Sequence, residues 1–126
     1  MARWPASPAL SARRNAMLPY YAALAAGILF GVVGQIVLKC GADGAATIRA
    51  QFLSPFTILG FGIYVLAAIC YIVAIKRIPL SLAYPSVSVS YIVVGLAAHF
   101  LWNEPFGAAQ LVGILLIGGG ILMLYQ

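Results

Sequence analysis

The hydrophobic and polar positions of this chain are arranged in blocks, with four long apolar runs separated by short polar stretches. The hydrocarbon core of a bilayer is ~30 Å thick, so a helix that rises 1.5 Å per residue needs about 20 residues to cross it. The blocks therefore predict an all-α membrane protein with four transmembrane helices. Their expected positions are about 19–38, 56–75, 80–101 and 108–125.

The polar stretches predict how these helices are connected. Residues 1–18 contain three arginines and no acidic residue, which indicates a basic, flexible segment ahead of a transmembrane domain at 19–126. The stretch that contains Lys76 and Arg77 is so short that it predicts an antiparallel helical hairpin. Pro85 lies one turn inside the third run, where a kink or a widened first turn is expected.

Composition and charge agree with a membrane protein. Hydrophobic residues make up 64% of the chain and charged residues 7%, whereas soluble domains have about 25% charged residues. The chain has 7 Lys and Arg against 2 Asp and Glu, and none of them lies inside the four runs. Five of the basic residues fall on one side of the predicted membrane and two on the other. This bias predicts a multi-pass protein with both termini in the cytoplasm.

Catalytic and metal-binding chemistry is not indicated by the sequence. Cys40 and Cys70 lie at different depths of the predicted helices and are not expected to form a disulfide. His99 has no second histidine or carboxylate near it in sequence, so we expect neither a metal nor a cofactor. No nucleophile with a base, no carboxylate pair and no phosphate-binding loop is evident. We therefore expect a protein that is not an enzyme.

Small residues form faces on the first and last predicted helices. In the first helix they recur every four residues and lead to Gln35 and Lys39, whose amide and ammonium groups need a polar partner or the membrane interface. Small residues allow another helix to approach closely, either within the chain or from a second subunit. We interpret four glycines as positions of dimer packing: Gly27, Gly31, Gly113 and Gly120.

Tyrosines share faces with small residues on the second and third predicted helices. Two such faces would form a groove with hydroxyl groups pointing inward. The alternative is that each hydroxyl bonds to a neighbouring carbonyl in a packed bundle. The candidate groove residues are Gln35, Tyr64, Tyr71, Tyr84, Ser88 and Tyr91.

Three motifs give the chain a family resemblance that covers nearly all of residues 17–126. They are Gly34-Gln35-x-x-x-Lys39, Ala83-Tyr84-Pro85 and Trp102-Asn103-Glu104-Pro105. With these motifs the chain resembles the small-multidrug-resistance branch of the drug/metabolite transporter (EamA-like) superfamily. Within that branch it is most similar to subunits of the 4-amino-4-deoxy-L-arabinose-phosphoundecaprenol flippase.

The chain differs from the drug exporters of this branch at two chemically important positions. Those exporters carry a glutamate in the first helix, which binds a proton or a cation, and this chain has Gly31 at the matching position. They also carry a tryptophan where this chain has Val87. The flippase subunits, like this chain, lack the acid. The difference therefore favours the flippase subunits over the exporters.

The resemblance implies a subunit that flips a polyprenyl-phosphate-linked amino sugar, or a related anionic lipid, across a bacterial inner membrane. It also implies an antiparallel dimer with eight helices, formed by two copies or with a paralogous four-helix subunit. Membrane lipid is an expected partner and nucleic acid is not. An exporter of small organic solutes and a non-transporting accessory subunit remain alternatives. The candidates for contact with the phosphate or head group are Lys39, Lys76, Arg77 and Glu104.

Overall fold

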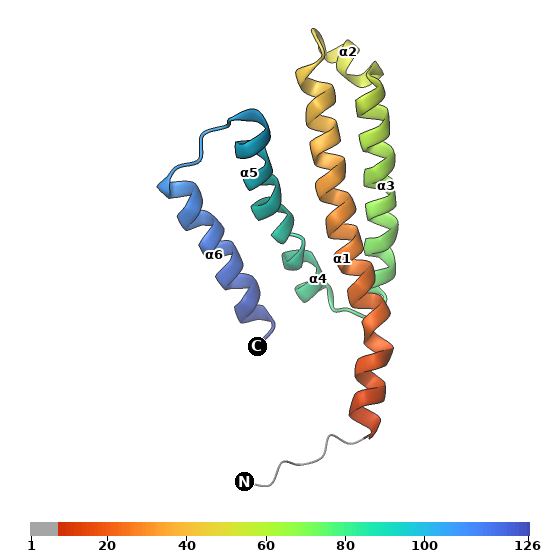
Figure 1. The fold of residues 1–126 in the computed structure, drawn as a ribbon. Helices are drawn as coiled ribbons and strands as arrows, with labels where there is room; N and C mark the ends of the chain where they lie inside the picture. The colour runs from red at the N-terminus through yellow and green to blue at the C-terminus, as the bar shows by residue number, and fades with distance from the viewer. Residues whose placement is uncertain (1–7) are drawn as a thin grey trace.

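The computed structural model describes residues 8–126, and within that range helices joined by turns and loops are the only regular secondary structure (Figure 1). The all-α prediction is therefore confirmed for the described residues. The six helices are α1 (Pro8–Asp43), α2 (Ile48–Leu53), α3 (Pro55–Ile75), α4 (Leu80–Ser86), α5 (Val89–Trp102) and α6 (Ala108–Leu124).

Three segments are long and apolar enough to cross a membrane. They lie at Ala12–Asp43 in α1, at Pro55–Ile75, and at Leu80–Trp102, which combines α4 and α5. Helix α6 is also apolar but has 17 residues, which corresponds to about 25 Å at 1.5 Å per residue. Three of the predicted spans are thus confirmed by length and composition, whereas the fourth crossing and the eight-helix dimer remain predictions.

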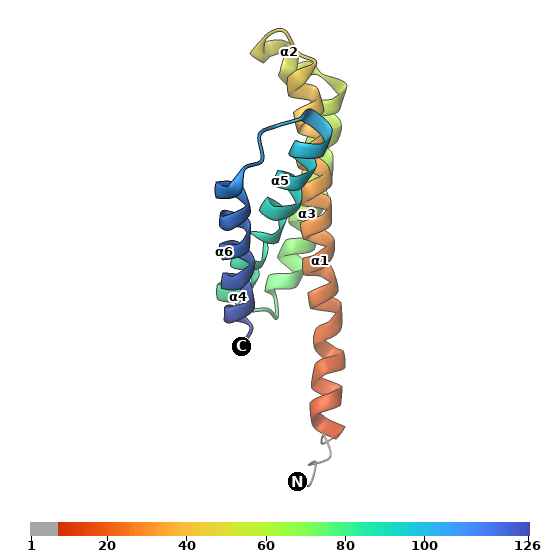
Figure 2. The same ribbon diagram turned by 60° about the vertical axis from the view of Figure 1, so that its left-hand side comes forward.

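Helix α1 is longer than the apolar run that predicted it. It begins at Pro8, a favourable first helical residue, and residues 8–18 are rich in strong helix formers. This part of the expected basic segment is therefore helical, and residues 1–7 lie outside the described range. With 36 residues α1 is about 54 Å long. Figure 2 shows its N-terminal part extending beyond the other helices.

Helices α1 and α3 pack closely because glycines line their contact. A Cβ atom on Gly41 would lie 2.6 Å from Oγ1 of Thr57, and one on Gly60 would lie 2.9 Å from Cγ of Leu38. Any larger residue at either position would push the two helices apart. On α1 the glycines recur every seven residues on the face toward α3: Gly27, Gly34 and Gly41.

The third predicted span is interrupted between α4 and α5, two residues after Pro85. Proline has no N–H and its ring clashes with the carbonyl four residues earlier, which weakens a helix around it, although α1 continues through Pro19. In the interruption the backbone forms hydrogen bonds that span three residues and not four, such as the one from Ser88 N to Pro85 O at 3.0 Å. Three serine hydroxyls also donate to nearby carbonyls: Ser86 to Leu82, Ser88 to Pro85 and Ser90 to Val87. The distortion predicted at Pro85 is therefore present, and its carbonyl groups are satisfied within the chain.

A small apolar core lies at the end of the bundle that holds the α3–α4 turn. It consists of Leu24, Ala74, Ile78 and Ala83, and Ile78 is only 2% exposed. Most large apolar side chains elsewhere remain exposed, as expected for a surface that faces lipid. Helix α6 packs only loosely on the bundle, and its C-terminal end is tied to α4 where the hydroxyls of Tyr125 and Ser86 lie 2.5 Å apart.

Candidate functional site

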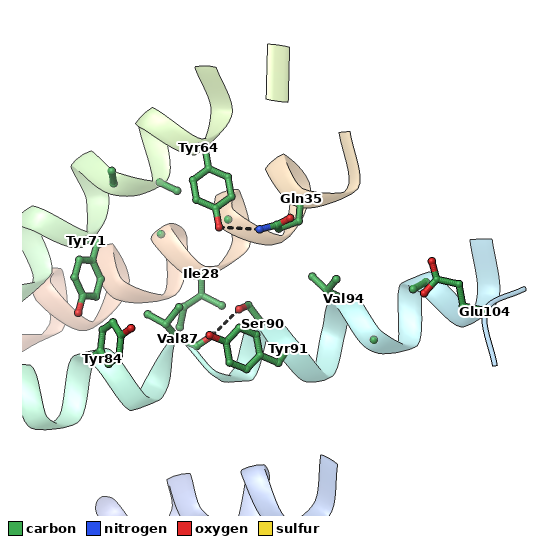
Figure 3. A pocket seen from close by; sticks show the side chains of 16 residues that line it. Ile28, Gln35, Tyr64, Tyr71, Tyr84, Val87, Ser90, Tyr91, Val94 and Glu104 are labelled. Carbon is green, nitrogen blue, oxygen red and sulfur yellow. Dashed lines mark hydrogen bonds between the residues drawn. The ribbon is translucent and has the colours of Figure 1, made fainter. Parts of the chain in front are cut away.

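A cavity of about 640 Å³ lies between α1, α3 and the α4–α5 segment (Figure 3). Ser88, the sixth predicted groove residue, is not among its lining residues, because its hydroxyl lies in the helix interruption and donates to Pro85 O. Ser90 lines the cavity in its place. The structure brings five of the six predicted groove residues together around the cavity: Gln35, Tyr64, Tyr71, Tyr84 and Tyr91.

Hydroxyl and amide groups on opposite walls make the middle of the cavity polar. Gln35 Nε2 on α1 donates to the hydroxyl oxygen of Tyr64 on α3, at 2.9 Å. The hydroxyl of Tyr71 is buried and has no hydrogen-bond partner. Figure 3 shows Tyr71 and Tyr84 on opposite sides of the cavity. A buried hydroxyl without a partner costs about 1–3 kcal/mol, so an oxygen-rich ligand that bonded to Tyr71 would remove this penalty.

Glycines leave room on the cavity walls. A Cβ atom on Gly31 or Gly95 would meet nothing within 4 Å. Gly27 faces α3, and its Cβ would lie 3.2 Å from a backbone oxygen of that helix. Of the two α1 glycines that we predicted for dimer packing, Gly27 packs against α3 and Gly31 lines the cavity, and a role in a dimer remains a prediction for both. Gly113 and Gly120 on α6 have open space around them, and their role in a dimer remains a prediction.

The end of the cavity near the loop between α5 and α6 carries its only charged lining residue, Glu104, among the residues that the structure describes. Lys39 Nζ lies 3.6 Å from Glu104 Oε1 and 3.3 Å from Asp43 Oδ1. The ion pair with Glu104 joins α1 to the loop before α6. The side chains of Lys39 and Glu104 are 43% and 46% exposed, and ion pairs this accessible stabilise a protein by up to about 1 kcal/mol. A ligand with charges of its own can therefore replace this pair at little cost.

Two local features position Glu104. Asn103 ends α5 in the left-handed conformation, with φ of 52°, so the chain turns sharply there. On the same helix, Nδ1 of His99 lies 2.8 Å from the backbone oxygen of Glu104. No cluster of three potential metal ligands occurs in residues 8–126. The contact that the structure gives for the His99 ring is with the backbone of Glu104, the residue that carries the carboxylate.

Lys76 and Arg77, the other two candidates for head-group contact, lie far from Glu104. Both are exposed in the turn between α3 and α4, and neither lines the cavity. Figure 1 places this turn at the opposite end of the bundle from the loop between α5 and α6. The four predicted residues therefore form two groups, one at each end of the bundle.

A second cavity, of about 320 Å³, lies between α5 and α6 and was not predicted. It shares four lining residues with the first cavity: Tyr91, Gly95, Ala98 and Glu104. Its α6 wall contains Gln110, Gly113 and Ile117, which follow one another at helical spacing. That spacing is the signal in the sequence that could have revealed this face.

Comparison with known proteins identifies the family. No protein-family model and no solved structure matches the chain. A probable 4-amino-4-deoxy-L-arabinose-phosphoundecaprenol flippase subunit ArnF from Shewanella sediminis is 36% identical over 100 residues, which cover 76% of this chain and 69% of that protein. A probable ArnE subunit of the same flippase, from Pseudomonas aeruginosa strain UCBPP-PA14, is 31% identical over 111 residues, covering 82% and 94%. The chain belongs to this flippase-subunit family.

Another relative agrees with this assignment. A probable ArnE subunit from Enterobacter sp. strain 638 is 32% identical over 98 residues. The matched residues cover 74% of the chain described here and 92% of the Enterobacter protein. The family resemblance seen in the sequence motifs is thus confirmed. The relatives are named as subunits of a flippase, which is a transport protein and not an enzyme. Together with the apolar helices, they identify this flippase subunit as a multi-pass membrane protein.

Proposed function

We propose that this flippase subunit helps to move a polyprenyl-phosphate-linked amino sugar from the inner to the outer leaflet of a bacterial inner membrane. The observation that carries the proposal is the cavity lined by tyrosines, which ends at the Lys39–Glu104 ion pair. The names of the relatives describe a substrate with an amine on its sugar and a phosphate beside it. A cavity with hydroxyl groups along its walls and both signs of charge at its end suits such a head group.

The hydroxyl and amide groups in this largely apolar cavity address the main energetic obstacle to lipid flipping. An unshielded phosphate in hydrocarbon costs on the order of 10 kcal/mol or more, whereas the apolar tail can stay in the bilayer. With the termini in the cytoplasm, Lys76 and Arg77 together with Arg13 and Arg14 would attract the phosphate at the inner leaflet. The tyrosine hydroxyls would then replace water around the head group as it crosses.

At the outer end, the head group would exchange partners with the ion pair. The ammonium of the amino sugar would bind Glu104, and Lys39, once released, would bind the phosphate. Each charge would keep a partner of opposite sign throughout the exchange. A head group without the amine would leave Glu104 facing a phosphate, which is unfavourable.

A second subunit would complete the path. In the single chain, Tyr84 is 72% exposed and Tyr91 is 65% exposed, although both line the cavity. The relatives carry two subunit names, ArnE and ArnF, which favours a heterodimer with a paralogous four-helix subunit over two copies of this chain. We propose an antiparallel arrangement, which would place a second set of tyrosines across the path.

The proposal is tested in proteoliposomes that contain this chain alone or together with an ArnE- or ArnF-type subunit from the same cell. We expect Glu104→Gln and Lys39→Gln each to lower translocation of the aminated lipid by about tenfold, because each removes a charge-assisted contact. Asp43→Asn is the matched control, since it removes the other ion pair of Lys39 without altering the cavity lining. Unchanged translocation in both Glu104→Gln and Lys39→Gln would contradict the assignment. Proton-driven uptake of organic cations would instead favour an exporter.

A further inference from the structure

The cavity between α5 and α6 changes from polar to apolar along its length. Glu104 and Gln110 lie at the end near the loop, and Gln110 Oε1 accepts a hydrogen bond from Gly107 N at 2.9 Å. Ile114 and Ile117 lie further along α6. From Gln110 to Ile117 the helix rises by about 10 Å. The cavity therefore suits a molecule that is charged at one end and apolar beyond it.

This cavity is continuous with the tyrosine-lined cavity through their shared wall on α5. Two of the shared residues are Gly95 and Ala98, which place only a hydrogen atom and a methyl group between the two spaces. Glu104 lines both cavities. On the opposite wall, a Cβ atom on Gly113 would meet nothing within 4 Å, so the space at that position is open. One ligand can thus reach from Glu104 into either cavity.

Helix α6 is held to the rest of the chain near one of its ends. The hydroxyls of Tyr125, just after α6, and of Ser86 on α4 form a hydrogen bond. Figures 1 and 2 both show α6 close to α4 at that end and further from α5 toward the loop before α6. Glu104 belongs to that loop and is the only charged residue that lines either cavity among the described residues.

We propose that the α5–α6 cavity binds the first isoprenoid units of the polyprenyl chain while the head group is at Glu104. This inference rests on the proposed function, because it assumes a lipid whose phosphate and amine sit at the Lys39–Glu104 pair. The chain of such a lipid lies in hydrocarbon, so what it gains from the protein is close packing against an apolar surface. The lining of both cavities is mainly apolar, and the first also carries the tyrosine hydroxyls. The α5–α6 cavity offers apolar side chains starting at the same carboxylate.

The test maps where the lipid chain binds. The full chain, with its partner subunit, is placed in lipid nanodiscs with a polyprenyl phosphate that carries a photoactivatable diazirine in its first isoprene unit. After illumination we expect mass spectrometry to find the label on Phe106, Ile114 or Ile117. Excess unlabelled polyprenyl phosphate should remove the label, and excess phosphatidylglycerol should not.

A pair of matched variants tests the same point by binding. Gly113→Leu fills the cavity from α6, and we expect it to weaken binding of the polyprenyl phosphate by about tenfold through lost apolar contact. Gly119→Leu is the control, because it makes the same change on the same helix, has open space around it and lines neither cavity. Circular dichroism and size-exclusion chromatography establish that both variants are folded and assembled like the wild type.

The outcomes separate this inference from the proposed function. Label on α1 or α3, or equal competition by phosphatidylglycerol, would overturn the inference, as would a partner helix found covering the cavity. If lipid binding depends on Glu104 but Gly113→Leu binds normally, the inference is wrong and the proposed function stands. If the wild-type assembly binds no polyprenyl phosphate, both are wrong. Should Gly113→Leu fail to fold, the label map of the wild type decides alone.

Discussion

Gly41→Ala should loosen the contact between α1 and α3. The added Cβ would lie 2.6 Å from Oγ1 and 3.0 Å from the backbone N of Thr57, whereas non-bonded carbon contacts are normally at about 3.5–4.0 Å. The backbone nitrogen cannot move without moving α3, so the two helices must separate. Overpacking of this kind costs about 1–3 kcal/mol, and the better helix propensity of alanine returns about 1 kcal/mol. We expect a net loss of stability of up to about 2 kcal/mol.

Gly31→Ala on the same helix provides the control. Its Cβ would meet nothing within 4 Å, so this variant should be as stable as the wild type, or more stable by up to about 1 kcal/mol. Thermal unfolding in detergent can be followed with a thiol-reactive dye that reports exposure of Cys70, which is half-buried on α3. If Gly41→Ala unfolds at the same temperature as Gly31→Ala or at a higher one, the reasoning that α1 and α3 are in close contact at Gly41 is wrong.

Three further predictions concern the cavity and α6. Gly31→Glu should place a carboxylate in the open cavity, raise binding of lipophilic cations in equilibrium dialysis and weaken binding of polyprenyl phosphate; unchanged cation binding would contradict it. Tyr71→Phe removes a buried hydroxyl without a hydrogen-bond partner, so the melting temperature should stay the same or rise while lipid binding weakens. A lower melting temperature would show that the hydroxyl makes a hydrogen bond within the protein. Tyr125→Phe breaks the hydrogen bond to Ser86, worth about 0.5–1.5 kcal/mol, and should speed amide hydrogen exchange in α6. Exchange at the wild-type rate would show that this hydrogen bond does not hold α6.

The sequence predicted the helices well because long apolar runs leave few alternatives in a bilayer. The start of α1 at Pro8 was not predictable from hydropathy, because residues 8–18 have no apolar run. Their helix propensity was the overlooked signal. The shift from Ser88 to Ser90 has a different origin. The hydroxyl of Ser88 donates to Pro85 O inside the interruption, whereas Tyr91 beyond it lines the cavity as the helical spacing predicted.

Packing between helices was harder to predict than the helices themselves. Glycines of α1 recur at both four-residue and seven-residue spacing, and either pattern gives a plausible contact face. The structure uses Gly34 and Gly41 against α3 and leaves Gly31 facing the cavity. The α5–α6 cavity depends on how the loop after Trp102 sets the angle of α6, which residue patterns do not encode.

The different packing of the two halves gives the bundle an uneven stiffness. The α1–α3 pair is held along its length by backbones in close contact, so it should move as one rigid body. Helix α6 is held mainly by its ends, with a hydrogen bond at one and a loop at the other. Lateral pressure from the membrane will therefore bend the α6 side first. A thicker or more ordered bilayer should narrow the space beside Glu104 while leaving the tyrosine wall of α3 unchanged.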